Sequence, residues 1–131
     1  MFALISFYAL ALLLGGMAVF SFVLSPLVFI KLPIEVAGPF IRQLFPWYFA
    51  VVAGLFGVAA LAGFSLLAAI MCALGFLNLF ALMPTINRLR DRQQSGDASA
   101  KRMFDLLHRS SVAINFVQMI AAGWLLWPGL G

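Results

Sequence analysis

Two long stretches without a charged residue constrain this chain more than any other feature of its sequence. Residues 1–30 and residues 44–87 contain no Asp, Glu, Lys or Arg. One helix over 44–87 would be about 66 Å long, whereas the hydrocarbon core of a bilayer is about 30 Å thick. We therefore expect one membrane span in the first stretch and two in the second, joined by a short turn between Gly57 and Ser65, with Gly63 the best candidate.

The composition agrees with a membrane protein. The chain is 65% hydrophobic and 9% charged, whereas a soluble domain is about 45–50% apolar and about 25% charged. A length of 131 residues suits one domain. The predicted fold class is an all-α, four-helix transmembrane bundle, with spans at about 3–28, 46–62, 65–87 and 108–127.

All charged residues lie in two segments, which we predict as loops at about 31–43 and 88–107 with a last basic residue at Arg109. With four spans, both segments lie on the same side of the membrane. Because Lys and Arg are in excess there, the positive-inside rule predicts that both loops are cytoplasmic and that both termini are outside. We expect a bacterial inner (plasma) membrane, and we do not interpret the net charge of +4 as nucleic-acid binding.

The first charged segment has a helical pattern. Ile34, Ala37, Ile41 and Leu44 fall on one face, and Pro33 suits a first helical turn. This pattern predicts a short amphipathic helix on the membrane surface between the first two spans.

The last apolar run carries a polar stripe. Asp105, His108, Ser111, Asn115 and Gln118 are spaced 3, 3, 4 and 3, and so share one helical face. Such a face must point at protein or water and not at lipid. With the amides of the third span, the polar intramembrane stripe comprises Asn78, Asn87, Ser111, Asn115 and Gln118.

Two interpretations of this stripe stay open. Its members either form hydrogen bonds between helices or line a polar cavity that opens to the cytoplasm. The mouth of such a cavity would be a cytoplasmic cluster of Glu35, Arg42, Arg90, Asp91, Asp105 and His108.

His108 is the only histidine. Metal sites usually take three or four protein ligands, so we expect an interfacial histidine bonded to Asp105 or to a backbone carbonyl, and no metal or other cofactor. A heme or copper centre on His108 is the alternative. The sequence has no paired intramembrane carboxylates, no phosphate-binding loop and no Ser-His-Asp set, so we expect no catalytic residue.

Several short motifs, in order along the chain, resemble the transmembrane-protein-205-like family. They are Gly15-Gly16-Met17 with Ser21-Phe22 and Pro26, Ala37-Gly38 with Leu44-Phe45-Pro46-x-Tyr48, Asn78, Pro84-x-Ile-Asn87-x-x-Arg90-Asp91, and Phe104-x-x-Leu107-His108-x-x-Ser111-x-x-x-Asn115-x-x-Gln118. The resemblance implies a small four-span membrane protein without an agreed activity. The Leu-His-x-x-Ser pattern is more loosely similar to the copper-resistance protein D type and to a bacterial membrane protoporphyrinogen oxidase, which implies heme or copper, but this chain has a single histidine.

Three functions therefore remain. The favoured one is a non-enzymatic membrane protein that acts through helix–helix, partner-protein or lipid contacts, as a homo-oligomer or as a small accessory subunit. The second is a small-solute or ion conduit that uses the polar stripe. The third is a heme- or metal-dependent redox protein centred on His108. The expected partners are the lipid bilayer and other membrane subunits or a second copy, and not nucleic acid.

Overall fold

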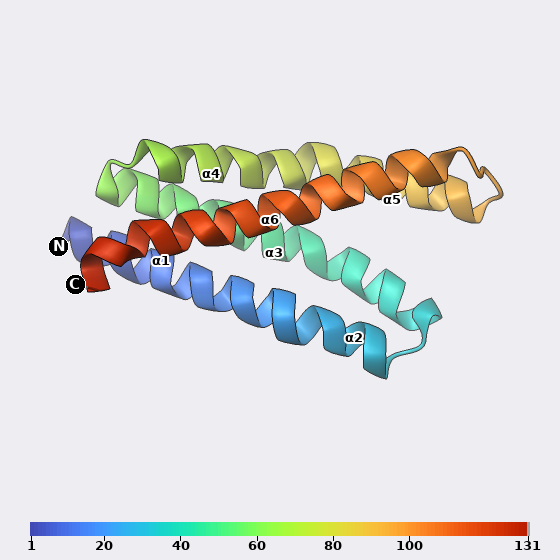
Figure 1. Ribbon diagram of the computed structural model, residues 1–131, viewed down its shortest axis with the longest axis horizontal. Helices are drawn as coiled ribbons and strands as arrows, with labels where there is room; N and C mark the ends of the chain where they lie inside the picture. The colour runs from blue at the N-terminus through green and yellow to red at the C-terminus, as the bar shows by residue number, and fades with distance from the viewer. Residues whose placement is uncertain (131) are drawn as a thin grey trace.

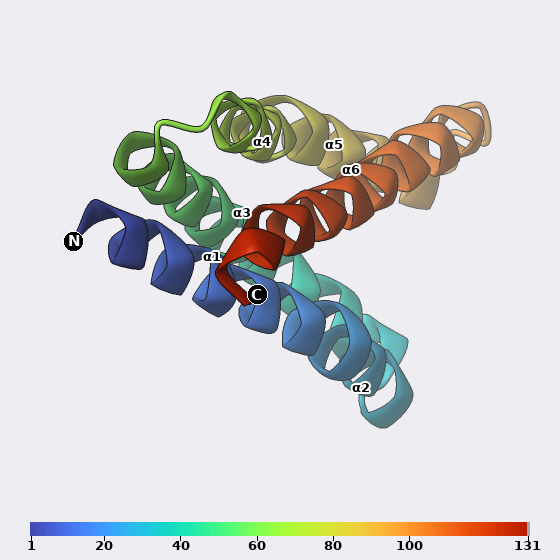
Figure 2. The same ribbon diagram turned by 60° about the vertical axis from the view of Figure 1, so that its left-hand side comes forward.

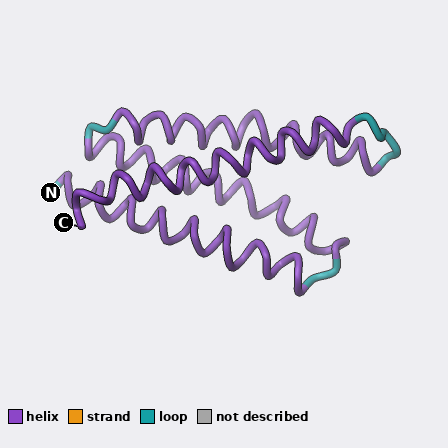
Figure 3. Tube along the Cα trace, in the orientation of Figure 1, coloured by secondary structure: helices purple, strands orange, loops and turns teal. Residues whose placement is uncertain are grey.

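The computed structural model describes residues 1–130, with side chains described as far as Pro128. Over this range the chain forms four helical rods and no strand. The rods are α1–η1–α2 (Phe2–Val19, Phe20–Leu24, Ser25–Lys31), α3 (Ile34–Gly63), α4–η2–α5 (Leu66–Leu77, Asn78–Leu82, Met83–Gln94) and α6 (Ala100–Leu130). The rods run alternately up and down, and both termini lie at the same end as the turn between α3 and α4 (Figures 1 and 3).

All four rods are long and apolar enough to cross a membrane. Their outward surfaces carry large apolar side chains, such as Leu61, Ile120 and Trp124, each more than two-thirds exposed. A surface of this kind is stable against lipid and not against water. The predicted four-helix transmembrane bundle is therefore confirmed.

The separate surface helix is not present. Helix α3 is continuous from Ile34 to Gly63, so its first turns take up the segment predicted to lie on the membrane surface. Ala37 and Ile41, the apolar face of that segment, pack against Val28 of α2 instead of against lipid. Pro39 and Pro46 are accommodated within the helix, because this packing outweighs the lost backbone hydrogen bonds.

The two connections in the charged segments are shorter than the sequence suggested. The chain reverses at Phe64, which has a left-handed backbone (φ 50°), directly after the predicted Gly63. The Ser65 hydroxyl then caps α4 by accepting a hydrogen bond from the Ala68 N–H at 3.2 Å. The predicted loop at 88–107 is reduced to residues 95–99, because α5 and α6 extend into it from both sides.

Two π-helical turns, η1 and η2, interrupt the first and third rods. In each, a backbone N–H bonds to the carbonyl five residues earlier: Ser25 to Phe20 and Met83 to Asn78. A proline follows directly in both rods and cannot donate to the helical ladder, which favours this wider turn. The helices beyond the π turns, α2 and α5, belong to the end of the bundle where the rods spread apart (Figures 1 and 2).

The packed core lies toward the termini. There Leu13, Met17, Val52 and Phe56 are almost completely buried, and they belong to one apolar cluster. At the other end, the α2–α3 and α5–α6 hairpins diverge (Figure 2). The bundle is thus closed at the terminal end and divided at the charged end.

Candidate functional site

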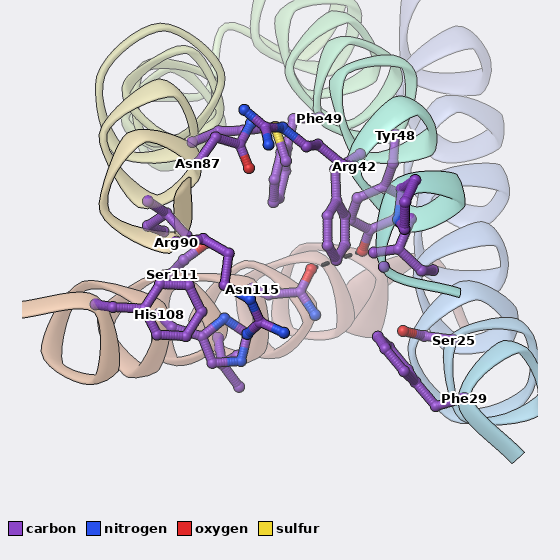
Figure 4. A pocket seen from close by; sticks show the side chains of 18 of the residues that line it. Ser25, Phe29, Arg42, Tyr48, Phe49, Asn87, Arg90, His108, Ser111 and Asn115 are labelled. Carbon is purple, nitrogen blue, oxygen red and sulfur yellow. Dashed lines mark hydrogen bonds between the residues drawn. The ribbon is translucent and has the colours of Figure 1, made fainter. Parts of the chain in front are cut away.

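A cleft of about 880 Å³ lies between the two diverging hairpins. All four rods contribute to its lining, as Figure 4 shows for side chains from α2, α3, α5 and α6. Its volume is in the range of pockets that hold small-molecule ligands, about 300–1,000 Å³. The polar and charged lining residues are Ser21, Ser25, Glu35, Arg42, Tyr48, Asn87, Arg90, Gln94, His108, Ser111 and Asn115.

Hydrogen bonds close the floor of the cleft. The Tyr48 hydroxyl donates to Asn115 Oδ1 at 2.6 Å, and Asn115 Nδ2 donates to Ser21 Oγ at 3.0 Å. The Tyr48 ring also stacks on Phe20, with the ring centroids 3.9 Å apart. These contacts tie the first rod, α3 and α6 together directly above the apolar core, so the cleft ends blind. They also satisfy the amide of Asn115, which would be costly to leave unpaired in a membrane.

An ion pair crosses the mouth of the cleft. Arg42 on α3 and Asp91 on α5 form two hydrogen bonds, Nη1 to Oδ1 at 2.7 Å and Nη2 to Oδ2 at 3.0 Å. Their side chains are 44% and 54% exposed. At such exposure an ion pair contributes at most about 1 kcal/mol of stability. The ion pair therefore bridges α3 and α5 but adds little to the stability of the bundle.

The wall formed by α5 and α6 carries a second cation. The Arg90 guanidinium lies over the Phe104 ring, 5.4 Å from its centroid. That ring is nearly parallel to the imidazole of His108, with the centroids 5.7 Å apart. Within the part of the chain that the structure describes, Arg90 forms no ion pair. Its N–H groups are thus held in place by the aromatic ring and not by a carboxylate.

The side of the cleft between α2 and α6 is open. Phe29 of α2 and Val112 and Phe116 of α6 line the cleft, and all three remain more than 40% exposed. Phe22 and Phe116 approach each other, with ring centroids 6.0 Å apart. Beyond this contact α2 and α6 separate (Figures 1 and 2). The cleft therefore opens sideways onto the apolar surface of the bundle.

Most of the residues singled out in the sequence come together here. The cleft is lined by Asn87, Ser111 and Asn115 from the stripe and by Glu35, Arg42, Arg90 and His108 from the mouth cluster. Asp91 joins them through Arg42. Asp105 does not, because it lies in a separate shallow groove with Lys101, Arg102 and Arg109.

Two members of the stripe lie apart from the cleft. Asn78 and Gln118 are completely buried. Gln118 Nε2 donates to the Met71 carbonyl oxygen at 3.0 Å, which links α6 to α4. Gln118 Oε1 and both amide atoms of Asn78 have no hydrogen-bond partner among the described residues. The stripe therefore divides into cleft-lining residues and a buried pair of amides.

His108 is exposed and stacks on Phe104. The predicted hydrogen bond to Asp105 or to a backbone carbonyl is not among the bonds that the described residues form. Over the same residues, no three His, Cys, Asp or Glu side chains gather in a way that could hold a metal ion. The surroundings of His108 thus supply one imidazole and no cluster of ligands.

The sequence interpretation missed two residues of the floor. Tyr48 and Ser21 are not among the residues of the predicted stripe or mouth cluster. Ser21 and Ser25 are four residues apart in an otherwise apolar stretch, which places both hydroxyls on one helical face. That spacing was a usable signal, whereas Tyr48 has no such local pattern.

The four apolar rods define the class of this protein, which is an integral membrane protein with four candidate spans. Residues 8–95 match the family described as "Domain of unknown function (DUF4149)". This match covers more than half of the chain, so the chain belongs to that family. No curated protein and no solved structure matches the chain. The matched residues include three walls of the cleft and exclude α6.

Proposed function

We propose that this protein acts without enzymatic chemistry, through contacts with a membrane lipid held in the cleft. The observation that carries the proposal is the shape of the cleft: it has a charged mouth, a blind floor and a side that opens onto the apolar surface. A lipid can enter such a site sideways while its tails stay in the bilayer. A water-soluble ligand gains nothing from a lateral opening toward lipid.

The walls suit an acyl chain and the mouth suits a headgroup. Phe29, Phe45 and Phe116 line the cleft with aromatic rings, and the guanidinium groups of Arg42 and Arg90 belong to the same lining (Figure 4). An acyl chain gains no hydrophobic free energy by moving from lipid into the cleft, because both surroundings are apolar. Affinity must therefore come from close packing and from the polar groups of the mouth.

The experiment is native mass spectrometry of the protein released gently from its own membrane. Ser25 points into the cleft, so Ser25→Trp places an indole ring where the lipid would lie. The matched control is Ala69→Trp, on the exposed surface of α4. We expect the wild type and Ala69→Trp to carry one lipid and Ser25→Trp to lose it. Equal lipid binding in all three proteins, or none in the wild type, contradicts the proposal.

A small-solute or ion conduit is the second candidate. The buried amides of Asn78 and Gln118 favour it, because they extend the polar residues beyond the floor of the cleft. The packed core around Leu13 and Phe56 argues against it. Solute or ion flux through liposomes containing the protein, abolished by Gln118→Leu, would replace our proposal with this one.

The same purified sample tests the remaining alternatives. An absorption band or a bound metal that is lost in His108→Ala would indicate a heme or copper protein. A defined oligomer or a co-purifying membrane subunit would identify protein contacts as the main activity. Kinship with the transmembrane-protein-205-like family also remains a proposal, supported by the motifs of the sequence.

We further propose a bacterial inner membrane as the location, with the charged end in the cytoplasm. The support is that all eight Lys and Arg lie at the end of the bundle opposite the termini. Membrane fractionation tests the location, and a reporter fused to the C-terminus tests the orientation. If a C-terminal reporter that works only in the cytoplasm is active, the proposed orientation is contradicted.

A further inference from the structure

The mouth of the cleft has an uneven pattern of charge. Arg42 is neutralised by its two hydrogen bonds with Asp91. Glu35 and Arg90 also line the cleft, and neither forms an ion pair within the described part of the chain. Glu35 lies in the first turn of α3 and Arg90 on α5, on a different wall. The mouth therefore presents one uncompensated anion and one uncompensated cation.

Arg90 is placed to bind a phosphate. Its guanidinium is held over Phe104 at 5.4 Å, so less side-chain freedom is lost when a ligand binds. The planar guanidinium matches two oxygens of a phosphate at once. Asn87 lies one turn earlier on α5 and lines the same cleft, so its amide N–H group can add a further donor on that wall.

Glu35 is placed to bind an ammonium group. Its carboxylate is an acceptor only, and a primary ammonium offers it three N–H donors. A quaternary ammonium offers it none. A headgroup with a net negative charge would bring the phosphate to Arg90 but would also repel Glu35.

We infer that the cleft selects a zwitterionic phospholipid with a primary ammonium headgroup, with its phosphate on Arg90 and its ammonium on Glu35. The ligand class is thus phosphatidylethanolamine and not phosphatidylcholine or phosphatidylglycerol. This inference rests on the proposed function, because it names the lipid that the cleft holds. The two residues recognise opposite charges of one molecule, which explains why they lie on different walls of the cleft and do not pair.

The test offers the delipidated protein equal amounts of the three phospholipids with identical acyl chains and measures bound lipid by native mass spectrometry. We expect the ethanolamine lipid to be preferred about tenfold over each competitor, as one charge-assisted hydrogen bond allows. Glu35→Gln should remove this preference. Arg90→Gln should lower the binding of all three lipids about tenfold. Arg88→Gln and Asp105→Asn remove one positive and one negative charge outside the cleft. These control variants should change neither the preference for the ethanolamine lipid nor the amount of lipid bound.

The outcomes separate this inference from the proposed function. If Ser25→Trp abolishes lipid binding but the three lipids bind equally well, only the headgroup assignment is overturned. The same holds if the preference for the ethanolamine lipid survives in Glu35→Gln. If no lipid is lost in Ser25→Trp, both fail. The final experiment adds soluble glycerophosphoethanolamine, which has the same headgroup without acyl chains. If it displaces the lipid at equal concentration, the ligand of the cleft is not a lipid. Because Glu35 and Arg90 are exposed, both variants should keep the melting temperature of the wild type.

Discussion

Replacing Gly75 with alanine tests a close contact between α3 and α4. Gly75 is buried, and a Cβ added there would lie 2.9 Å from the Cβ and 3.1 Å from the Cα of Ala53. Real Cβ atoms essentially never approach another atom this closely. The obstacle is the Cβ of Ala53 together with the α3 backbone beside it, and neither can rotate away as a long side chain can. One of the two helices must therefore shift.

Two opposing terms set the size of the effect. Overpacking of a well-packed core costs about 1–3 kcal/mol. Alanine is favoured over glycine inside a helix by about 1 kcal/mol, which offsets part of this cost. The difference between these two terms is about 0–2 kcal/mol, so we expect Gly75→Ala to lower the free energy of unfolding by up to about 2 kcal/mol. Gly54→Ala on α3 is the control, because an added Cβ meets nothing within 4 Å there, and it should be neutral or slightly stabilising.

The assay is equilibrium unfolding of the purified protein in mixed micelles with increasing denaturing detergent. The double variant Gly75→Ala with Ala53→Gly removes the Cβ on the opposite helix. Because Ala53→Gly alone costs about 1 kcal/mol inside a helix, we expect the double variant to lose less stability than the sum of the two single losses. If Gly75→Ala is as stable as Gly54→Ala, or if the losses of the two single variants simply add in the double variant, the packing argument is refuted.

Two further predictions use the same measurement of unfolding, and a third concerns the loop at 95–99. Tyr48→Phe removes the donor to Asn115 Oδ1 and should cost about 1–3 kcal/mol, because a partly buried amide loses its partner. Asn78→Leu removes two buried polar atoms that have no hydrogen-bond partner in the described structure and should stabilise the protein by about 1 kcal/mol or more. The Ser99 hydroxyl and the Arg92 guanidinium lower the pKa of the Asp97 carboxyl. Ionised Asp97 therefore stabilises the 95–99 loop at any pH above the ordinary pKa of an Asp. This contribution is lost as the pH falls through the lowered pKa.

Each of these has a control or a contradicting result. Tyr8→Phe, on an exposed tyrosine, should leave stability unchanged. A loss of stability in Asn78→Leu would mean that the Asn78 amide is satisfied, contrary to the structure. For the loop, protease cleavage between residues 95 and 99 should increase in acid for the wild type, and Asp97→Asn should show the increased cleavage already at neutral pH. Cleavage that is independent of pH in the wild type contradicts the assignment.

The arrangement of the rods was largely predictable from charge and length. The charge-free stretch at 44–87 is too long for one span and long enough for two, and the chain does reverse at Phe64 and Ser65. The segments that hold all the Lys and Arg lie at one end of the bundle because charged side chains are excluded from the hydrocarbon core. Both results depend only on the cost of placing charge in hydrocarbon, which does not depend on how the helices pack.

The surface helix was predicted incorrectly because its pattern has two physical meanings. The apolar face of Ala37 and Ile41 suits the membrane surface as well as it suits another helix. Val28 of α2 decides the matter by packing against that face, and the pattern of residues 34–43 contains no information about this neighbour. The helical extent of 88–94 was missed likewise, since a polar helix beyond the bilayer resembles a loop in composition.

The cleft was predictable as a set of residues but not as a shape. Spacing placed His108, Ser111, Asn115 and Gln118 on one face of α6. The crossing of α6 over its neighbours then assigned Asn115 to Tyr48 of α3 and Gln118 to Met71 of α4. A shift of one turn changes the partner helix, so the division of the stripe depends on the crossing geometry.

By itself, the sequence determined that this chain forms four apolar helices with its charges at one end, because the bilayer imposes helix length and excludes charge whatever the tertiary contacts are. Only the tertiary structure decided that the rods diverge at that end and that Tyr48, Asn115 and Ser21 close the floor of a laterally open cleft. Contacts between residues far apart in the chain depend on the angles at which helices cross. The crossing of α3 and α4, for example, depends on the close approach of Gly75 to Ala53, which no local pattern reveals.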